Sequence, residues 1–375
     1  MTETKTQPSQ NNWLSRARSE TSFSAQYGYI PALDGLRLLA VTIVVIRHFD
    51  ISDRVPGGFG VSIFFFISGF LITRLLLAEE KKYGKIGLGN FYIRRFIRLL
   101  PPLLLMGAVA IPVLFLIDAD NFAWNRVILS FTYLGNLSEL TVIFFHWDQG
   151  WGELGPLWSL AVEEHFYLLL PPLLLALKRP RSRLVAVAAV VVVPLILRLA
   201  VYATVDAKYA DPINYLSTPM RLDALAWGVL LTLLLDDNRL RSLTKGRTQH
   251  LLVWGGCLAM FFTLFHWSSM YEIAIKYTPQ SIAIGTSFLG VLFAHRYLWL
   301  RIILEFPPIR YLGSISYEIY LWHALIFTLV TKMIGTGVGP TFMATVLSVV
   351  VSDAAFRLTT KRLRSWRTRF GGHPV

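Results

Sequence analysis

The chain has 375 residues, of which 54% are hydrophobic and only 16% are charged, and its formal net charge is +13. Apolar runs long enough to cross a bilayer recur from residue 38 to residue 356, which excludes a soluble globular domain. The basic residues lie in short clusters between these runs, so we interpret the charge as a determinant of membrane orientation and expect no nucleic-acid partner. The single cysteine, Cys257, excludes an intrachain disulfide, and the scattered histidines predict no metal site.

The pattern predicts an all-α polytopic membrane protein built from one transmembrane domain, residues 30–358. Residues 1–29 are polar, lack the apolar core of a signal peptide and are expected to form a disordered cytoplasmic tail. Residues 359–375 are expected to form a basic cytoplasmic tail. The ten predicted spans, each near the roughly 20 residues that cross a bilayer, are 31–49, 60–78, 97–117, 157–177, 184–204, 220–235, 250–267, 281–298, 313–333 and 340–358.

The distribution of positive charge favours ten spans with both termini in the cytoplasm. Each inside segment then holds three to six Lys or Arg, whereas the outside loops together hold four. The stretch 126–145 is moderately apolar, but if it also spanned, the basic cluster at 178–183 would lie outside. We therefore expect 118–156 to form a long outer region that contains a short helix.

The first predicted span carries two ionisable residues, Arg37 and His48, which are eleven residues apart. This spacing is about three helical turns, so both residues share a face with Asp34 and lie about 16 Å apart along the axis. An ionisable group facing lipid costs about 3 kcal/mol, so this face is expected to line protein or a watery cavity. The alternative is that Arg37 and His48 are boundary residues at the inner and outer interfaces.

An acidic pair lies near the outer end of the fourth predicted span. Ser159 and Glu163 share a helical face, and Glu164 is adjacent. Two carboxylates are costly within a membrane unless they are paired or functional. The alternative to a functional role is a structural ion pair with Arg221 or Arg37.

Two later spans add polar groups that are candidates for substrate binding or for structural polar contacts. The segment 220–228 contains Arg221 and Asp223, and Tyr317, Tyr320 and His323 follow one another at helical spacing. The two tyrosines would serve equally well as packing and hydrogen-bonding residues between helices.

Basic residues at the start of the third span suit a phosphate group. Arg95 and Arg98 are one turn apart and project together. Their alternative role is to anchor the span at the inner interface. Ser68 has no base near it in the sequence, so a serine nucleophile is not predicted.

Six motifs, taken in order, resemble those of the membrane acyltransferase-3 family, the O-acetyltransferases of bacterial surface carbohydrates. The resemblance covers roughly residues 30–358. Two positions depart from it: Ser62 stands where many members have Asp, and Glu318 where small or apolar residues are common. The motifs are Arg37 followed after ten residues by His48, GVSIFFFISGFLIT, RRFIRLLPP, WSLAVEEHFYLLLP, RLDALAWG and SYEIYLWH.

The resemblance implies a ten-span enzyme of the bacterial cytoplasmic (inner) membrane. It would move an acyl group, usually acetyl, from cytoplasmic acyl-CoA to a hydroxyl of a carbohydrate such as peptidoglycan, lipopolysaccharide or another cell-envelope polysaccharide. Acyl-CoA is then a donor co-substrate, and no permanently bound cofactor is expected. The resemblance implies that His48 is the catalytic histidine and that Arg37 is its motif partner. It also implies that Glu163 and Glu164 are the family's acidic pair, and that Arg95 and Arg98 bind the CoA end of the donor.

The mechanism that follows from this resemblance uses His48 as a general base on the acceptor hydroxyl as it attacks the thioester. Glu163 or Glu164 is expected to orient the imidazole or the acceptor. Arg37 or Arg221 is available to stabilise negative charge. The sequence is compatible with direct transfer and with a transient acyl-enzyme, and it does not determine the oligomeric state.

A transporter or flippase that uses intramembrane Arg, His and Glu as a substrate or proton pathway is the alternative function. Aromatic residues of the outer region, including Trp147, Trp151 and Trp158, are candidates for stacking on a sugar. An interfacial aromatic belt would use the same residues.

Overall fold

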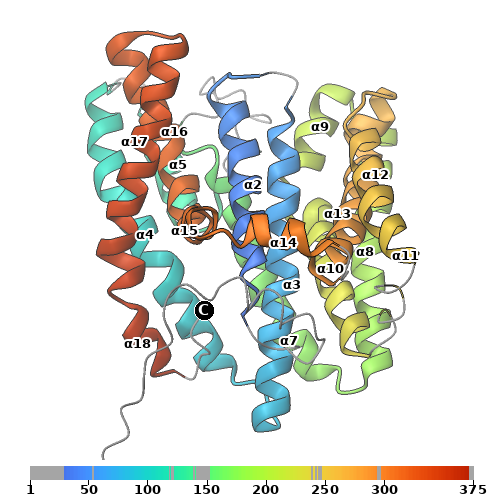
Figure 1. The fold of residues 1–375 in the computed structure, drawn as a ribbon. Helices are drawn as coiled ribbons and strands as arrows, with labels where there is room; N and C mark the ends of the chain where they lie inside the picture. The colour runs from blue at the N-terminus through green and yellow to red at the C-terminus, as the bar shows by residue number, and fades with distance from the viewer. Residues whose placement is uncertain are drawn as a thin grey trace, which may run out of the picture.

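The computed structural model describes residues 29–52, 55–117, 119, 122–137, 140, 153–237, 240, 243, 247–293 and 297–370, and all regular secondary structure in these ranges is helical. Figure 1 shows long helices standing roughly side by side, with two short helices, α14 (Leu298–Leu304) and α15 (Pro307–Ser314), lying across them. The predicted all-α class is confirmed.

The other helices follow the chain in two stretches. The first stretch comprises α2 (Ala32–His48), α3 (Gly57–Tyr83), α4 (Leu88–Ile117), α5 (Trp124–Phe131), α7 (Leu157–Ala176), α8 (Pro180–Thr204), α9 (Ala207–Leu216) and α10 (Thr218–Asp236). The second comprises α11 (Thr248–His250), η3 (Leu251–Gly255), α12 (Gly256–Thr263), η4 (Tyr271–Ile275), α13 (Tyr277–Phe293), α16 (Ser316–Ile334), α17 (Val338–Phe356), η6 (Arg357–Lys361) and α18 (Arg364–Thr368).

Six helices among the described residues are long and apolar enough to cross a membrane, and α13 with α14 makes a seventh if this bent pair counts as one span. The molecule is therefore a polytopic membrane protein. The other predicted spans also coincide with helices. Of these, α2 has only 17 residues, the 250–267 region is divided between η3 and α12, and α16 has its hydropathy lowered by polar residues such as Glu318 and His323.

The region predicted to lie outside between residues 118 and 156 does contain a short helix, as expected. This helix, α5, has eight residues and is too short to cross a bilayer. It packs on α4 and α7. Trp147 and Trp151 lie outside the described residues.

Helices α3 and α10 form the most extensive helix pair, and two glycines allow their close approach. A Cβ atom added at Gly228 would lie 2.2 Å from the carbonyl oxygen of Phe66, and one at Gly69 would lie 1.9 Å from that of Leu225. Small residues at a crossing let helix backbones pack tightly within a membrane. This contact fixes α3, which carries Ser62 and Ser68, against α10, which carries Arg221 and Asp223.

We expect Gly228→Ala to lower the free energy of unfolding by at least about 2 kcal/mol, because the new methyl group would force two backbones apart. The measurement is thermal unfolding of the purified protein in detergent. Gly89→Ala is the matched control, since nothing lies within 4 Å of a Cβ added there. Equal melting temperatures for the two variants would contradict the close-packing argument.

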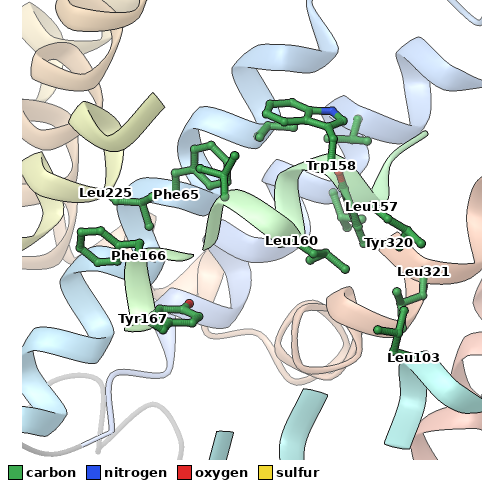
Figure 2. Close-up of a cluster of buried hydrophobic side chains, with 14 of the residues drawn as sticks. Phe65, Leu103, Leu157, Trp158, Leu160, Phe166, Tyr167, Leu225, Tyr320 and Leu321 are labelled. Carbon is green, nitrogen blue, oxygen red and sulfur yellow. The ribbon is translucent and has the colours of Figure 1, made fainter. Parts of the chain in front are cut away.

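Helix α7 lies at the centre of the largest apolar cluster, where α3, α4, α10 and α16 surround it (Figure 2). The cluster includes Phe65, Trp158, Phe166, Leu225 and Leu321, all at most 5% exposed. The acidic pair of α7 is thus held inside the helix bundle by residues on both sides of it.

The C-terminal residues up to Phe370 continue from α17 through η6 and α18 and pack against α4. The guanidinium of Arg94 donates a hydrogen bond of 2.8 Å to the carbonyl oxygen of Phe370. Thr360 donates a hydrogen bond of 2.6 Å to the buried carboxylate of Glu318 on α16. The described part of the predicted tail is therefore helical and attached to the transmembrane domain.

Candidate active site

A polar cavity lies between α2, α3, α4, α7 and α16. Its volume is about 700 Å3, including space open to solvent. Seven residues singled out in the sequence line it, although they come from four separate helices. They are Arg37, Arg95, Arg98, Ser159, Glu163, Tyr317 and Tyr320.

A second, more basic pocket adjoins the polar cavity and has a volume of about 1070 Å3, again including open space. The two share Leu71, Arg95 and Arg98 in their walls. This basic pocket is bounded by the C-terminal end of α3, the N-terminal part of α4 and α18. Its charged lining residues are Glu79, Lys82, Arg94, Arg95, Arg98 and Arg367.

The cationic groups of the basic pocket exceed its anionic groups. Arg94 forms an ion pair of 2.7 Å with Glu79, which neutralises both. Within the described ranges, neither Arg95 nor Arg98 forms an ion pair, and Nε of Arg95 has no hydrogen-bond partner. The guanidinium of Arg95 instead lies 3.8 Å from the ring centre of Tyr167. The junction of the two cavities therefore suits a multiply charged anion such as a phosphate.

Glu163 is the hydrogen-bonding centre of the polar cavity. The hydroxyl groups of Ser68 on α3 and Tyr167 on α7 both donate to the same oxygen, Oε1, of Glu163. The structural ion pair considered from the sequence does not form at this carboxylate. Arg37 pairs with Asp34 at 3.2 Å, and Arg221 donates to Oγ of Ser62. Glu164 is half-buried beside Glu163 and does not line the cavity.

Tyr320 lines the cavity and links α16 to the start of α7. Its hydroxyl donates to the carbonyl oxygen of Pro156 at 2.9 Å and lies 2.6 Å from Oγ of Ser159. Tyr317 donates to the carbonyl oxygen of Leu99 at 2.9 Å. Both tyrosines therefore form interhelical hydrogen bonds and also line the cavity.

His48 is exposed at the end of α2 and contacts His323, which is fully buried. Nδ1 of His48 lies 2.7 Å from Nε2 of His323. The ring of His323 lies 5.6 Å from the ring of Tyr320, which lines the cavity. Among the described residues, neither Glu163 nor Glu164 hydrogen-bonds to His48. One of these carboxylates was expected to orient the imidazole of His48 or the acceptor, and in the structure the hydrogen-bond partner of this imidazole is His323.

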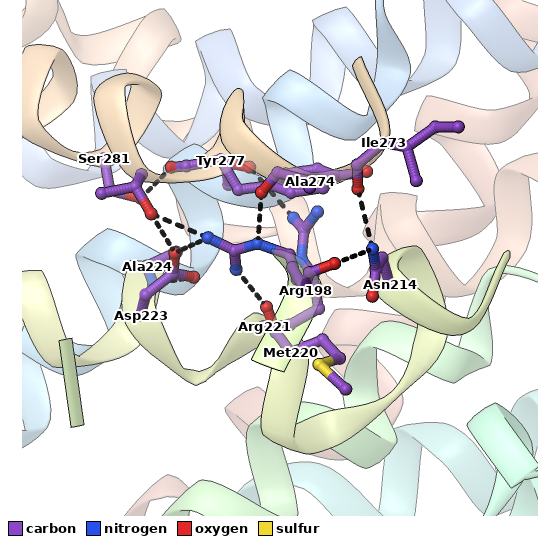
Figure 3. Close-up of polar contacts among 12 residues, drawn as sticks. Arg198, Asn214, Met220, Arg221, Asp223, Ala224, Ile273, Ala274, Tyr277 and Ser281 are labelled. Carbon is purple, nitrogen blue, oxygen red and sulfur yellow. Dashed lines mark hydrogen bonds and ion pairs between the residues drawn. The ribbon is translucent and has the colours of Figure 1, made fainter. Parts of the chain in front are cut away.

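Arg221 and Asp223 do not line the polar cavity, and Figure 3 shows both of them within a group of polar contacts between helices. The buried Asp223 forms an ion pair of 2.8 Å with Arg198. Arg198 also donates a hydrogen bond of 2.7 Å to the carbonyl oxygen of Ala274. Asn214 donates to the carbonyl oxygens of Arg198 and Ile273. These bonds join α8, α9, α10 and η4, so the role of Asp223 in this structure is structural.

Arg221 is fully buried among aromatic rings. It donates to Oγ of Ser62 at 3.1 Å, and its guanidinium lies 4.0 Å from the ring centre of Tyr277. Trp158 is 4% exposed and packs on Phe65 and Tyr215, so in this structure it is a core residue and not a surface for stacking on a sugar.

Four contributors to the site were not expected from the sequence. Ser68 was set aside because no base is near it in the chain, and its partner Glu163 lies 95 residues away. Tyr167 is four residues after Glu163, and this helical spacing was an available signal. Lys82 and Arg367 belong to clusters of basic residues that membrane orientation already accounts for. Nothing in the sequence therefore marked these two residues as part of the basic pocket.

A family model described as an acyltransferase domain matches residues 30–357. The peptidoglycan O-acetyltransferase OatA of Listeria monocytogenes is 32% identical over 359 residues, which cover 90% of this chain and 56% of that protein. A putative O-acetyltransferase of Staphylococcus aureus is 30% identical, covering 88% and 56%. The putative peptidoglycan O-acetyltransferase YrhL of Bacillus subtilis is 32% identical, covering 86% and 52%.

The chain thus spans about half the length of the curated relatives that it matches. No solved structure matches it. The family model covers nearly all of the described helices, including those that carry the polar cavity, the basic pocket and the histidine pair. The chain belongs to the acyltransferase-3 family.

Proposed function

We propose that the protein is a membrane O-acetyltransferase that moves an acetyl group from cytoplasmic acetyl-CoA to a hydroxyl of peptidoglycan on the outer side of the bacterial cytoplasmic membrane. The observation that carries this proposal is the junction of the basic pocket and the polar cavity at Arg95 and Arg98. A pocket with unpaired cations suits the phosphates of CoA, and the adjoining cavity suits its long polar arm.

The topology that fits this function has ten spans and both termini in the cytoplasm. It adds α2, the run of η3 and α12, α13 and α16 to the six helices that meet the length and composition requirements. The basic pocket then faces the cytoplasm, because the flanking segments 79–98 and 357–369 each hold six Lys or Arg. His48 lies at the opposite end of α2, about 16 Å from Arg37 along the helix axis.

The proposed step begins when the acceptor hydroxyl approaches the exposed imidazole of His48. The imidazole takes the hydroxyl proton while the oxygen forms a bond to the acyl carbon of the thioester. The carbon–sulfur bond then breaks, and the proton passes from His48 to the departing thiolate. Arg37 lines the cavity, so it is a candidate for stabilising negative charge on the donor side.

Peptidoglycan is proposed as the acceptor because two of the relatives bear that name, OatA of Listeria monocytogenes and YrhL of Bacillus subtilis. The proposal concerns the acceptor class and the acetyl group together. It replaces the broader expectation that included lipopolysaccharide.

The experiment compares thiol release with transport in the purified protein. We expect acetyl-CoA to be cleaved, with free CoA thiol appearing in proportion to added peptidoglycan fragments. A transporter or flippase would instead exchange intact substrate across proteoliposomes without releasing thiol. Counterflow of this kind, with no acceptor-dependent cleavage, would overturn the proposed function.

A further inference from the structure

The two histidines, His48 and His323, form one linear hydrogen bond. Their ring planes differ by only 3°, their centroids are 5.0 Å apart, and the two facing nitrogens are 2.7 Å apart. The distance between the ring centres is about the nitrogen–nitrogen distance plus the centre-to-nitrogen distance of each ring, so the two centres and the two nitrogens lie nearly on one line. Because the ring planes are also nearly parallel, the rings lie edge to edge in one plane. An N–H of one ring therefore points directly at the lone pair of the other.

The position of the protons follows from the far side of His323. Nδ1 of His323 lies 2.8 Å from the carbonyl oxygen of Tyr320 and 3.2 Å from that of Ile319. A carbonyl oxygen only accepts hydrogen bonds, so Nδ1 carries a proton. In the neutral ring, Nε2 of His323 then has a lone pair and accepts from Nδ1 of His48.

His323 is neutral because its surroundings do not support a second proton. It is fully buried, and the described side chains nearest to it include the rings of Phe49 and Tyr320. Burying a cation without a carboxylate partner is costly, and in the part of the chain that the structure describes His323 hydrogen-bonds to His48 and to backbone carbonyl oxygens, with no carboxylate among its partners.

We propose that His323 is a positioning residue that fixes the tautomer of His48, so that Nε2 of His48 has the free lone pair. The chain of bonds runs from the carbonyl oxygen of Tyr320 through both rings to the exposed end of α2. His323 thus has the role that a carboxylate has in many catalytic triads. This inference rests on the proposed function of His48 as the general base.

The arrangement affects the proton that His48 gains during transfer. When Nε2 takes the acceptor proton, the Nδ1–H bond to His323 becomes charge-assisted and stabilises the imidazolium. Without His323, His48 is free to rotate and to place its proton on Nε2, which removes the base. A neutral partner serves inside a membrane because it needs no buried counter-charge.

The first measurement is the nitrogen NMR spectrum of histidine-labelled wild-type protein in detergent at a pH where His48 is neutral, with the His48 signals identified from His48→Gln. We expect Nδ1 of His48 to be protonated and Nε2 to be unprotonated. The opposite tautomer in the wild-type protein would overturn the inference. His250, whose Nδ1 lies 2.6 Å from the hydroxyl of Tyr297, is an internal control that should not change.

The second measurement compares two replacements of His323. His323→Phe keeps a ring but has no acceptor, and we expect kcat to fall about 10²- to 10⁴-fold with an unchanged KM for acetyl-CoA. His323→Gln places an amide oxygen near the position of Nε2, and we expect it to retain activity within about tenfold of wild type. Equal losses in two folded variants would indicate a packing role and overturn the inference.

The outcomes separate the two proposals. If His48→Ala retains full activity, the base role fails, whereas the wild-type spectrum still tests the tautomer. If the spectrum shows Nε2 of His48 protonated, the role of His323 fails, whereas His48 can still be required for transfer. The spectrum of the wild-type protein reports the tautomer of His48 even if the His323 variants do not fold.

Discussion

Replacing His48 with alanine is expected to lower acetyl transfer about 10²- to 10⁴-fold, because general-base catalysis makes a contribution of about this size and, among the described residues, the one histidine in contact with His48 cannot replace it. His323, the neighbouring histidine, is fully buried and turns its Nδ1 toward backbone carbonyl oxygens. The rate is measured as thiol release in the presence of a peptidoglycan acceptor. The KM for acetyl-CoA should stay the same, since the basic pocket lies at the other end of the path.

The control for this variant is His266→Ala. His266 is an exposed histidine whose side chain is 71% accessible, and it lies far along the chain from the proposed site. We expect its removal to leave transfer unchanged. Normal acetylation by a well-folded His48→Ala protein would exclude His48 as the base and would leave the two cavities as a binding path without an assigned catalyst.

Replacing Arg95 and Arg98 together with glutamine is expected to raise the KM for acetyl-CoA about 10²- to 10³-fold. Each charge-assisted hydrogen bond to a phosphate contributes about 2 kcal/mol, and both arginines line the wall that the basic pocket and the polar cavity share. The kcat at saturating donor should change much less, because neither arginine lies near the histidine pair. Initial rates over a wide range of acetyl-CoA concentrations separate the two constants.

Arg364→Gln is the matched control for loss of positive charge at the same face. Arg364 is exposed on α18 and does not line the basic pocket, whereas Arg367 on the same short helix does. We expect its KM to remain near that of wild type. A similar rise in KM for the control would mean that the face attracts acetyl-CoA through its overall charge and not through a site.

The sequence was a good guide wherever hydrophobic length or helical spacing carried the information. Each of the ten predicted spans overlaps a helical segment, and six of these helices, or seven with the bent pair α13 and α14, are long and apolar enough to cross a membrane. Arg37, whose helical face was expected to line protein or a watery cavity, lines one cavity with Arg95, Arg98 and Glu163. Ionisable groups in membrane-spanning helices are costly when they face lipid, so they face the interior of the helix bundle or a watery cavity. Several such groups therefore predict a shared interior site.

The sequence was a poor guide to contacts between distant helices. The bond from Ser68 to Glu163 and the pair of His48 with His323 depend on how α2, α3, α7 and α16 pack, which spacing within one helix does not determine. The separation of Asp223 from the cavity has the same origin, since its partner Arg198 comes from α8. Six motifs in order indicated the family, but the structure was needed to group their side chains.

The central claim is that the basic pocket holds the phosphate end of CoA on the cytoplasmic side, and that the acetyl group is transferred beside His48 to a hydroxyl on the opposite side of the membrane. The most direct measurement uses proteoliposomes with the inner face of the protein toward labelled acetyl-CoA and with peptidoglycan fragments on the other side. Mass spectrometry of the fragments should find labelled O-acetyl groups with wild-type protein and none above background with His48→Ala. Unlabelled fragments with active wild-type protein, or equal labelling by both proteins, would contradict the account.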